Sequence, residues 1–171
     1  MVNSQGKSKA CLAVLAERKT RFYIAIKMPD RKAETMEKAI VSALGQFPRE
    51  LVKSITCDRG PEFANWQKIE ERLHCDVYFA DLYCPWQKGT VENLNGLLHE
   101  FYHKGRKLSC VFAATLKRNL ALINARLRKV LNFHSPQNLW DFELSSCCTW
   151  LDKSLLQRRF DRLVMEGELL F

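Results

Sequence analysis

Two carboxylates placed at the ends of two different elements constrain the fold of this chain most strongly. Asp58 follows a short apolar run and precedes an Arg-Gly turn, which is typical of a residue at the end of a β-strand. Glu92 follows a Gln-Lys-Gly turn and opens a segment with apolar residues at helical spacing, which predicts a position in the first turn of a helix. A fold that brings Asp58 and Glu92 together would create a site for a hard divalent cation, which prefers oxygen ligands.

The remaining sequence predicts alternating strands and helices. Apolar, β-branched and aromatic residues over 10–16 and 22–28 flank a charged turn, so they predict an antiparallel hairpin. Helical spacing and short apolar runs predict helices over 31–47, 63–73, 90–102 and 109–129, and strands over 53–57 and 75–80. This order of elements, with carboxylates at strand ends, indicates a ribonuclease-H-like α/β fold.

Longer motifs surround both carboxylates. They read Thr56-Cys57-Asp58-Arg59-Gly60-Pro61-Glu62-Phe63 and Pro85-Trp86-Gln87-Lys88-Gly89-Thr90-Val91-Glu92-Asn93. Together they closely resemble the catalytic core of insertion-sequence-30 family transposases, members of the retroviral-integrase-like group that uses an Asp, Asp, Glu triad. The resemblance runs from about residue 9 to about residue 142 and is strongest over 54–98. Asp58 alone would be explained as a turn cap and Glu92 alone as a solvated helix residue, but the joint pattern favours the family.

The resemblance implies a retroviral-integrase-like fold with an incomplete first strand, followed by C-terminal helices. In the family, the first Asp lies on the first strand, ahead of a Gly/Lys-rich hairpin that corresponds here to residues 6–9. The first Asp would therefore fall at or before Met1, and no Asp or Glu precedes Glu17. We expect a catalytic core over 1–143 with a curtailed first strand, and a divergent tail over 144–171 that is either a docked helix or sequence read out of frame.

The resemblance also implies metal-dependent DNA cleavage and strand transfer in transposition. In that role Asp58 would bridge two Mg²⁺ (or Mn²⁺) ions and Glu92 would ligate one of them, with binding impaired by the missing third carboxylate. The implied partners are DNA, both transposon ends and target DNA, and other copies of the chain in a homo-oligomer. We therefore expect a transposase core fragment that is inactive alone; the alternative is a residual DNA-binding or dimerisation module that modulates full-length transposase.

Basic residues are concentrated in one part of the chain. The formal net charge is +8, and segment 88–130 holds nine Lys or Arg against two Glu, as expected of a phosphate-binding face or of a solvated helical surface. Residues 124–129 resemble an Asn-x-Arg-Pro-Arg-Lys element of the family, with Leu127 in place of Pro. The expected DNA-binding residues are Trp86, Gln87, Lys88, Asn93, Asn95, Lys104, Arg106, Lys107, Arg126, Arg128 and Lys129. Core packing is the alternative for Trp86, and helix-end surface charge is the alternative for Arg126 and Arg128.

The cysteines and the hydropathy pattern indicate a cellular setting. Seven Cys residues without a C-x-x-C pair favour reduced thiols in a cytosolic protein. The resemblance further implies a bacterial cytoplasmic protein that is nucleoid-associated when bound to DNA. No apolar run approaches the length of a membrane span, and no membrane partner is expected.

A competing motif is His99-Glu100-Phe101-Tyr102-His103, which matches the His-Glu-x-x-His pattern of zinc metallohydrolases. On a helix it would place two imidazoles on one face, with Glu100 as the base. The motif falls at the end of the predicted helix, however, and neither His74 nor His134 is positioned as a third ligand by a recognisable pattern. Zinc hydrolysis is therefore the least favoured of the three functions.

Overall fold

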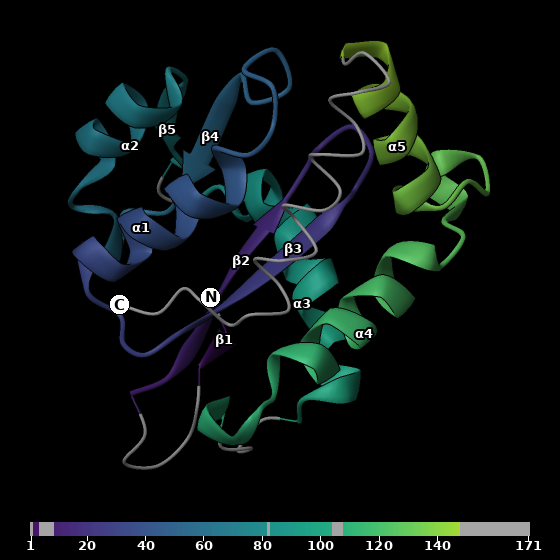
Figure 1. The fold of residues 1–171 in the computed structure, drawn as a ribbon, viewed down its shortest axis with the longest axis horizontal. Coiled ribbons are helices and arrows are strands. Elements are labelled where there is room, and N and C mark those ends of the chain that lie inside the picture. Colours follow the sequence, from purple (N-terminus) through teal and green to yellow (C-terminus); the bar gives the residue numbers. More distant parts are fainter. Residues whose placement is uncertain (1, 4–8, 82, 104–107, 148–171) are drawn as a thin grey trace.

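The structure is a computed structural model that describes residues 2–3, 9–81, 83–103 and 108–147, and in it helices cover both sides of the strands (Figure 1). Strands β2 (Cys11–Ala16) and β3 (Tyr23–Met28) form an antiparallel hairpin, and β1 (Val2–Asn3) pairs with the beginning of β2. Strands β4 (Ser54–Cys57) and β5 (Asp76–Phe79) form a separate parallel pair. The helices are α1 (Ala33–Leu44), α2 (Trp66–Leu73), α3 (Gly89–Phe101), α4 (Ala113–Ala125) and α5 (Pro136–Cys147). Short 3₁₀ helices are η1 (Pro61–Phe63), η2 (Pro85–Lys88), η3 (Leu108–Cys110) and η4 (Lys129–Leu131).

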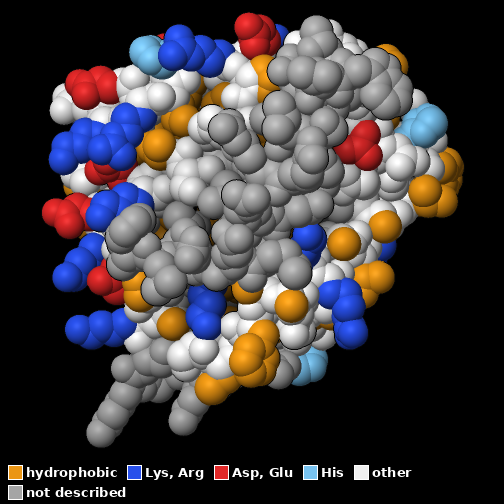
Figure 2. All heavy atoms as spheres, in the orientation of Figure 1, with side chains coloured by type: hydrophobic (Ala, Val, Ile, Leu, Met, Phe, Trp, Pro, Cys, Tyr) orange, Lys and Arg blue, Asp and Glu red, His pale blue; other side chains and the backbone are white. Residues whose placement is uncertain are grey.

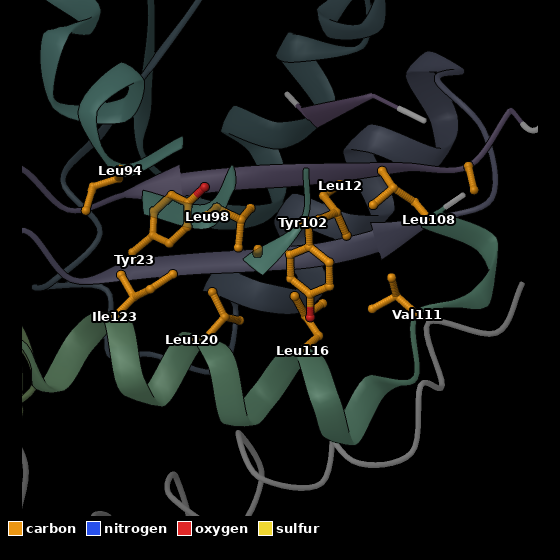
Figure 3. Packing of buried hydrophobic residues seen from close by; sticks show 12 residues of the cluster. Leu12, Tyr23, Leu94, Leu98, Tyr102, Leu108, Val111, Leu116, Leu120 and Ile123 are labelled. Carbon is orange, nitrogen blue, oxygen red and sulfur yellow. The ribbon is translucent and has the colours of Figure 1, made fainter. Parts of the chain in front are cut away.

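Alternation along β2 divides the core into two apolar clusters. Cys11 and Ala13 pack on one face of the strand, with residues of α1, α2, β4 and β5. Leu12 packs on the opposite face, with residues of β3, α3 and α4. Figure 3 shows the second cluster, in which the side chains of Leu120 and Ile123 extend from α4 toward the hairpin. The expected α/β organisation, in which strands and helices alternate along the chain, is confirmed.

Helix α5 is anchored by an aromatic cluster at one end of the hairpin. The Trp140 ring stacks on the Phe22 ring with a centroid separation of 5.0 Å and an interplanar angle of 6°. The Phe47 ring meets Trp140 edge-on, also with a centroid separation of 5.0 Å. These three residues are buried and tie α5 to β3 and to the segment after α1.

One predicted element is wrong in its extent. The sequence predicts one helix over 109–129, whereas α4 spans Ala113–Ala125 and is preceded and followed by 3₁₀ helices. Phe112 is extended before α4, and Arg126 is extended after it with φ −65° and ψ 128°. The chain then turns back, and the Arg128 amide donates to the His134 carbonyl at 3.2 Å. The chain thus reverses over residues 126–134, where the apolar spacing would have continued the helix.

The predicted boundary between core and tail stays a prediction. Helix α5 continues through residue 143 to Cys147, and residues 148–171 lie outside the described part of the chain. The predicted turn over residues 6–9 also falls largely outside it, and the described residues on either side of it pair antiparallel as β1 and β2. Of the helices that the structure describes, none has the length and apolar character needed to cross a bilayer.

Candidate active site and nucleic-acid interface

Asp58 follows directly on the last residue of β4, as the sequence predicts. Along β4, Ile55 and Cys57 are buried while Ser54 and Thr56 are exposed, so the strand has one apolar and one polar face. Burial raises the pKa of the Cys57 thiol to about 12, with the charge of Asp58 adding to the effect. Cys57 is thus a neutral core residue at physiological pH, and Asp58 is the exposed ionisable group at this strand end.

Glu92 lies in the first turn of α3 and is exposed, again as predicted. The beginning of α3 is held on the β2–β3 hairpin by polar contacts. The Arg21 guanidinium donates to the Thr90 hydroxyl, and the Tyr23 hydroxyl donates to Asn95 Oδ1 at 2.7 Å. These contacts fix the helix turn that carries Glu92 against the sheet.

Asp58 and Glu92 line one cleft, which has a volume of about 620 Å³. Gln87 and Asn95 line it as well, and so do two further carboxylates, Glu17 and Glu62. The sequence-based site is therefore assembled from β4, the loop before α3, and α3 itself.

The two additional carboxylates lie in different surroundings. Glu17 stabilises the turn between β2 and β3, because its carboxylate accepts hydrogen bonds from the Lys19 amide at 2.8 Å and from Thr20. The Glu62 carboxyl group folds over Gly60, where all three of its heavy atoms lie within 2.9 Å of the position that a Cβ would occupy.

The donor chemistry fits a hard divalent cation, but the set of ligands is incomplete. Carboxylate oxygens are the ligands that Mg²⁺ prefers. Within residues 2–3, 9–81, 83–103 and 108–147, however, no group of three His, Cys, Asp or Glu residues could hold a metal ion. Four carboxylates of the described residues line the cleft, but no three of them lie together as a group that could hold a metal ion.

The loop before α3 is ordered by contacts that the sequence did not indicate. The Gln87 side chain accepts from the Asp81 amide at 2.9 Å and donates to the Asp81 carboxylate at 3.0 Å. Arg18, from the β2–β3 turn, donates to the Gln87 carbonyl at 3.2 Å. Trp86 is 74% exposed, so core packing does not explain it. Arg18 was missed because its only signal in the sequence is a charged turn 69 residues away from Gln87.

The predicted basic residues after α3 are partly engaged within the protein. Arg126 forms an ion pair with Glu100 at 2.8 Å, and this hydrogen bond lowers the pKa of the Glu100 carboxyl group. Arg128 is half-buried, and burial lowers the pKa of its guanidinium, with the charges of Arg126 and Arg21 adding to the effect. Arg21, Arg126 and Arg128 therefore form one basic cluster, in which Arg21 contacts Thr90 at the beginning of α3 and Arg126 contacts Glu100 in its last turn.

The other predicted DNA-binding residues are less constrained. Lys129 and Asn93 are exposed, whereas Asn95 is half-buried and holds the Tyr23 hydroxyl. Lys104, Arg106 and Lys107 lie outside the described residues, and of Lys88 only the backbone is described.

The structure does not support the zinc motif. Helix α3 ends at Phe101, so His99 and His103 do not lie on successive turns of one helix. Glu100 is paired with Arg126, and His99 Nδ1 lies 3.1 Å from the Tyr102 carbonyl oxygen.

Asn124, the first residue of the basic motif, has a structural role that sequence reasoning missed. It is 3% exposed and makes two hydrogen bonds to the backbone of Tyr23. Its Oδ1 accepts from the Tyr23 amide at 3.0 Å, and its Nδ2 donates to the Tyr23 carbonyl at 2.9 Å. Asn124 thereby takes the place of a neighbouring strand at the outer edge of β3.

Comparisons with known proteins agree with this geometry. Residues 1–85 match the family model described as "Integrase core domain", a match that includes Asp58 and stops before Glu92. The chain is 36% identical over 129 residues to the transposase for insertion sequence element IS1086 of Cupriavidus metallidurans, covering 75% of this chain and 38% of the relative. It is 33% identical over 134 residues to the transposase InsI for insertion sequence element IS30A of Escherichia coli, covering 78% of this chain and 35% of that protein.

The extent of these matches bears on the site. The match to the IS1086 transposase covers 129 of the 171 residues, so 42 residues are left unmatched. Wherever the match begins, it therefore includes residues 43–129. Both Asp58 and Glu92 fall within that range. The chain itself covers little more than a third of each relative's length. Among solved structures, the catalytic core domain of BIV integrase has the same fold, with a TM-score of 0.58 and 17% sequence identity over 82% of this chain and 98% of that one. The predicted resemblance is thus confirmed.

Proposed function

The chain carries an integrase-like core homologous to those of insertion-sequence-30 transposases, and we propose that it is the DNA-handling part of a metal-dependent polynucleotidyl transferase. One observation carries the proposal: Asp58 and Glu92, which come from different elements, line the same cleft. In this role they are two of the carboxylates that hold Mg²⁺ or Mn²⁺. Such ions, when bound, activate the attacking oxygen and stabilise the leaving oxygen of a phosphodiester.

The proposed DNA contacts come from the basic cluster and the exposed loop beside the cleft. Arg126 and Lys129 are exposed in the segment that follows α4, and Trp86 extends into solvent from the loop before α3. Contacts of this kind bind phosphates without reading the sequence of bases. The side of the molecule formed by α1 and α2 has a different charge distribution. Figure 2 shows its Lys and Arg side chains interspersed with Asp and Glu, so it does not present a uniformly positive surface to DNA.

DNA binding should therefore be independent of sequence and sensitive to salt. Each neutralised phosphate contributes a slope of about −0.9 to the dependence of log K on log salt for duplex DNA. We expect Lys129→Gln to reduce the slope by about one unit, and Lys68→Gln on α2 to leave it unchanged, as measured by fluorescence anisotropy. Equal effects of the two substitutions, or affinity that does not change with salt, would contradict the proposed interface.

The sheet register predicts where a third carboxylate would complete the site. Val2 lies opposite Leu12, so the second position before Val2 in a continued strand lies opposite Val14. Residues directly opposite one another share a face, and Val14 packs with Leu12 on the side of α3, which carries Glu92. An Asp at that position would therefore face the same side of the sheet as Glu92.

A pair of N-terminally extended chains tests the proposed function. The first carries a strand with Asp opposite Val14, and the matched control moves the Asp one residue later, opposite Ala13, which turns it to the other face. We expect Mg²⁺- or Mn²⁺-dependent nicking of DNA by the first extension only, abolished by Asp58→Asn or Glu92→Gln. Nicking by the unextended chain, or equal nicking by both extensions, would show that the carboxylates have been assigned wrongly.

A further inference from the structure

A second, smaller pocket lies next to the cleft of Asp58 and Glu92. It has a volume of about 380 Å³, and its lining residues are Arg59, Gly60, Phe63, Ala64, Trp66 and Phe79. They come from η1 and its flanking residues, from the beginning of α2 and from the end of β5, and Figure 1 shows α2 and β5 side by side. Phe63 lines the cleft as well as the pocket, so the two hollows share one wall.

Three aromatic rings form the apolar part of this pocket. Phe63, Trp66 and Phe79 are half-buried and pack against the core cluster that includes Ile69. The Trp66 and Phe79 rings meet at an interplanar angle of 89°, with their centroids 5.9 Å apart. A flat ring that stacks on one of them therefore stands edge-on to the other, and both arrangements are favourable. The pocket thus fits a planar aromatic ligand.

Arg59 adds a positive charge to the lining. It is exposed, and its side chain makes no hydrogen bond or ion pair within the part of the chain that the structure describes. Arg126, by contrast, is paired with Glu100. An exposed guanidinium can bind a phosphate through two hydrogen bonds. None of the described residues that line the pocket is a carboxylate, so its charge favours an anionic group attached to the planar ring.

A planar ring attached to a phosphate is a nucleotide. A base within a duplex is stacked and paired, so it has to be unpaired before it can enter such a pocket. We propose that this pocket binds one unpaired nucleobase of a DNA strand that passes through the cleft, with Arg59 on an adjoining phosphate. The inference rests on the proposed function, in which Asp58, the residue before Arg59, helps to hold the reacting phosphodiester. It adds that the DNA beside the reacting phosphate is bound in a melted form.

Two single strands of equal charge test the inference without metal and without catalysis. The probe is an oligothymidine of about eight nucleotides, and its matched control is a strand of the same length made of abasic nucleotides. We expect the chain to bind oligothymidine at least about fivefold more tightly, as measured by fluorescence anisotropy, because stacking of one base on an aromatic ring contributes that much or more.

The outcomes separate this inference from the proposed function. Equal affinity for the two single strands, together with salt-sensitive binding of duplex DNA, would overturn the pocket and leave the proposed function intact. Binding of no DNA of any kind would contradict both.

Substitutions assign the preference to the pocket. Trp66→Leu removes the ring but keeps an apolar side chain, and it should lower the ratio of the two affinities to about one. Arg59→Gln should weaken both strands by similar factors, because each strand carries the same phosphates. Phe142→Leu, at an exposed aromatic residue of α5 outside both linings, should change neither affinity. A ratio that persists in Trp66→Leu, or that falls only in Trp86→Leu, would overturn the proposal.

Photocrosslinking locates the base in the unsubstituted chain, so it does not depend on the stability of any variant. Iodouracil in a single strand couples under ultraviolet light to an aromatic ring on which it stacks, and mass spectrometry identifies the coupled residue. We expect the crosslink on Phe63, Trp66 or Phe79. Crosslinks confined to Trp86, or to aromatic residues of α4 and α5, would overturn the proposal.

Discussion

Replacement of Asn124 should destabilise the fold far more than its place in a basic surface motif suggests. The Asn124 side chain satisfies both the amide and the carbonyl of Tyr23, and both residues are buried. An unsatisfied buried polar group costs about 1–3 kcal/mol. Asn124→Leu leaves two such groups, so the free energy of unfolding should fall by about 3 kcal/mol, which corresponds to about 6–12 °C in Tm for a chain of this size.

The same helix offers a matched control. Asn119 is also buried, but its Nδ2 makes one hydrogen bond, to the Tyr102 hydroxyl at 3.0 Å, which is not a backbone group. Asn119→Leu should therefore cost about 1 kcal/mol. Urea denaturation followed by circular dichroism measures both values, and the m-value should stay constant. Equal losses for the two substitutions would refute the argument that Asn124 serves as a substitute strand edge.

The substitution Asn124→Asp should make the free energy of unfolding depend on pH, in a direction that the hydrogen bonds predict. The Asp oxygen still accepts from the Tyr23 amide, but an ionised carboxylate cannot donate to the Tyr23 carbonyl. Burial raises the pKa of this carboxyl group in the folded state above its unfolded value of about 3.9. Its stabilising contribution is complete below the unfolded pKa and is lost as pH rises through the folded pKa. The stability deficit against the native chain should therefore be smaller at pH 5 than at pH 8, and a deficit independent of pH would contradict the assigned hydrogen bonds.

Two further predictions concern the core. Trp140→Ala removes the ring that contacts both Phe22 and Phe47, so it should lower the free energy of unfolding by about 3–5 kcal/mol. Trp140→Phe should cost clearly less. A melting temperature that barely changes in Trp140→Ala would show that α5 is not anchored by this ring. Under native conditions iodoacetamide should label the exposed Cys110 rapidly, and Cys57 only on unfolding, because burial raises the pKa of the Cys57 thiol to about 12. Mass spectrometry measures both labelling rates. Similar rates for the two residues would disprove the burial of Cys57.

Local sequence signals predicted the positions of the two carboxylates in the secondary structure, because the residues next to each one indicate where a strand ends or a helix begins. The apolar run before Asp58 ends with the strand, and the Gly turn before Glu92 begins the helix. The end of α4 was not predictable in this way. Arg126 adopts the extended ψ of 128° that a residue before Pro would require, although Leu127 follows it. The bridge between Arg128 and His134 sets this geometry, and apolar spacing gives no sign of it.

The contacts that shape the site were equally hidden from sequence reasoning. Arg18 binds the Gln87 carbonyl across 69 residues, and Asn124 binds Tyr23 across 101. Asn124 illustrates the difficulty, because its place in a motif with Arg126 and Arg128 suggests contact with DNA, while its burial gives it a structural role. The cleft that Asp58 and Glu92 line depends on how separate elements pack together, which no local pattern encodes.

The central claim is that Asp58 and Glu92 share one metal site, and titration with Mn²⁺ tests it most directly. Paramagnetic broadening in NMR spectra of the isotope-labelled chain should reach the amides of both residues at the same low Mn²⁺ concentration, and should spare the exposed Glu34 and Glu71 on α1 and α2. Either Asp58→Asn or Glu92→Gln should remove the broadening at both positions, because one carboxylate alone holds the ion poorly. Broadening at only one carboxylate, or its loss only at the substituted position, would mean that the two residues bind separately and would contradict the account.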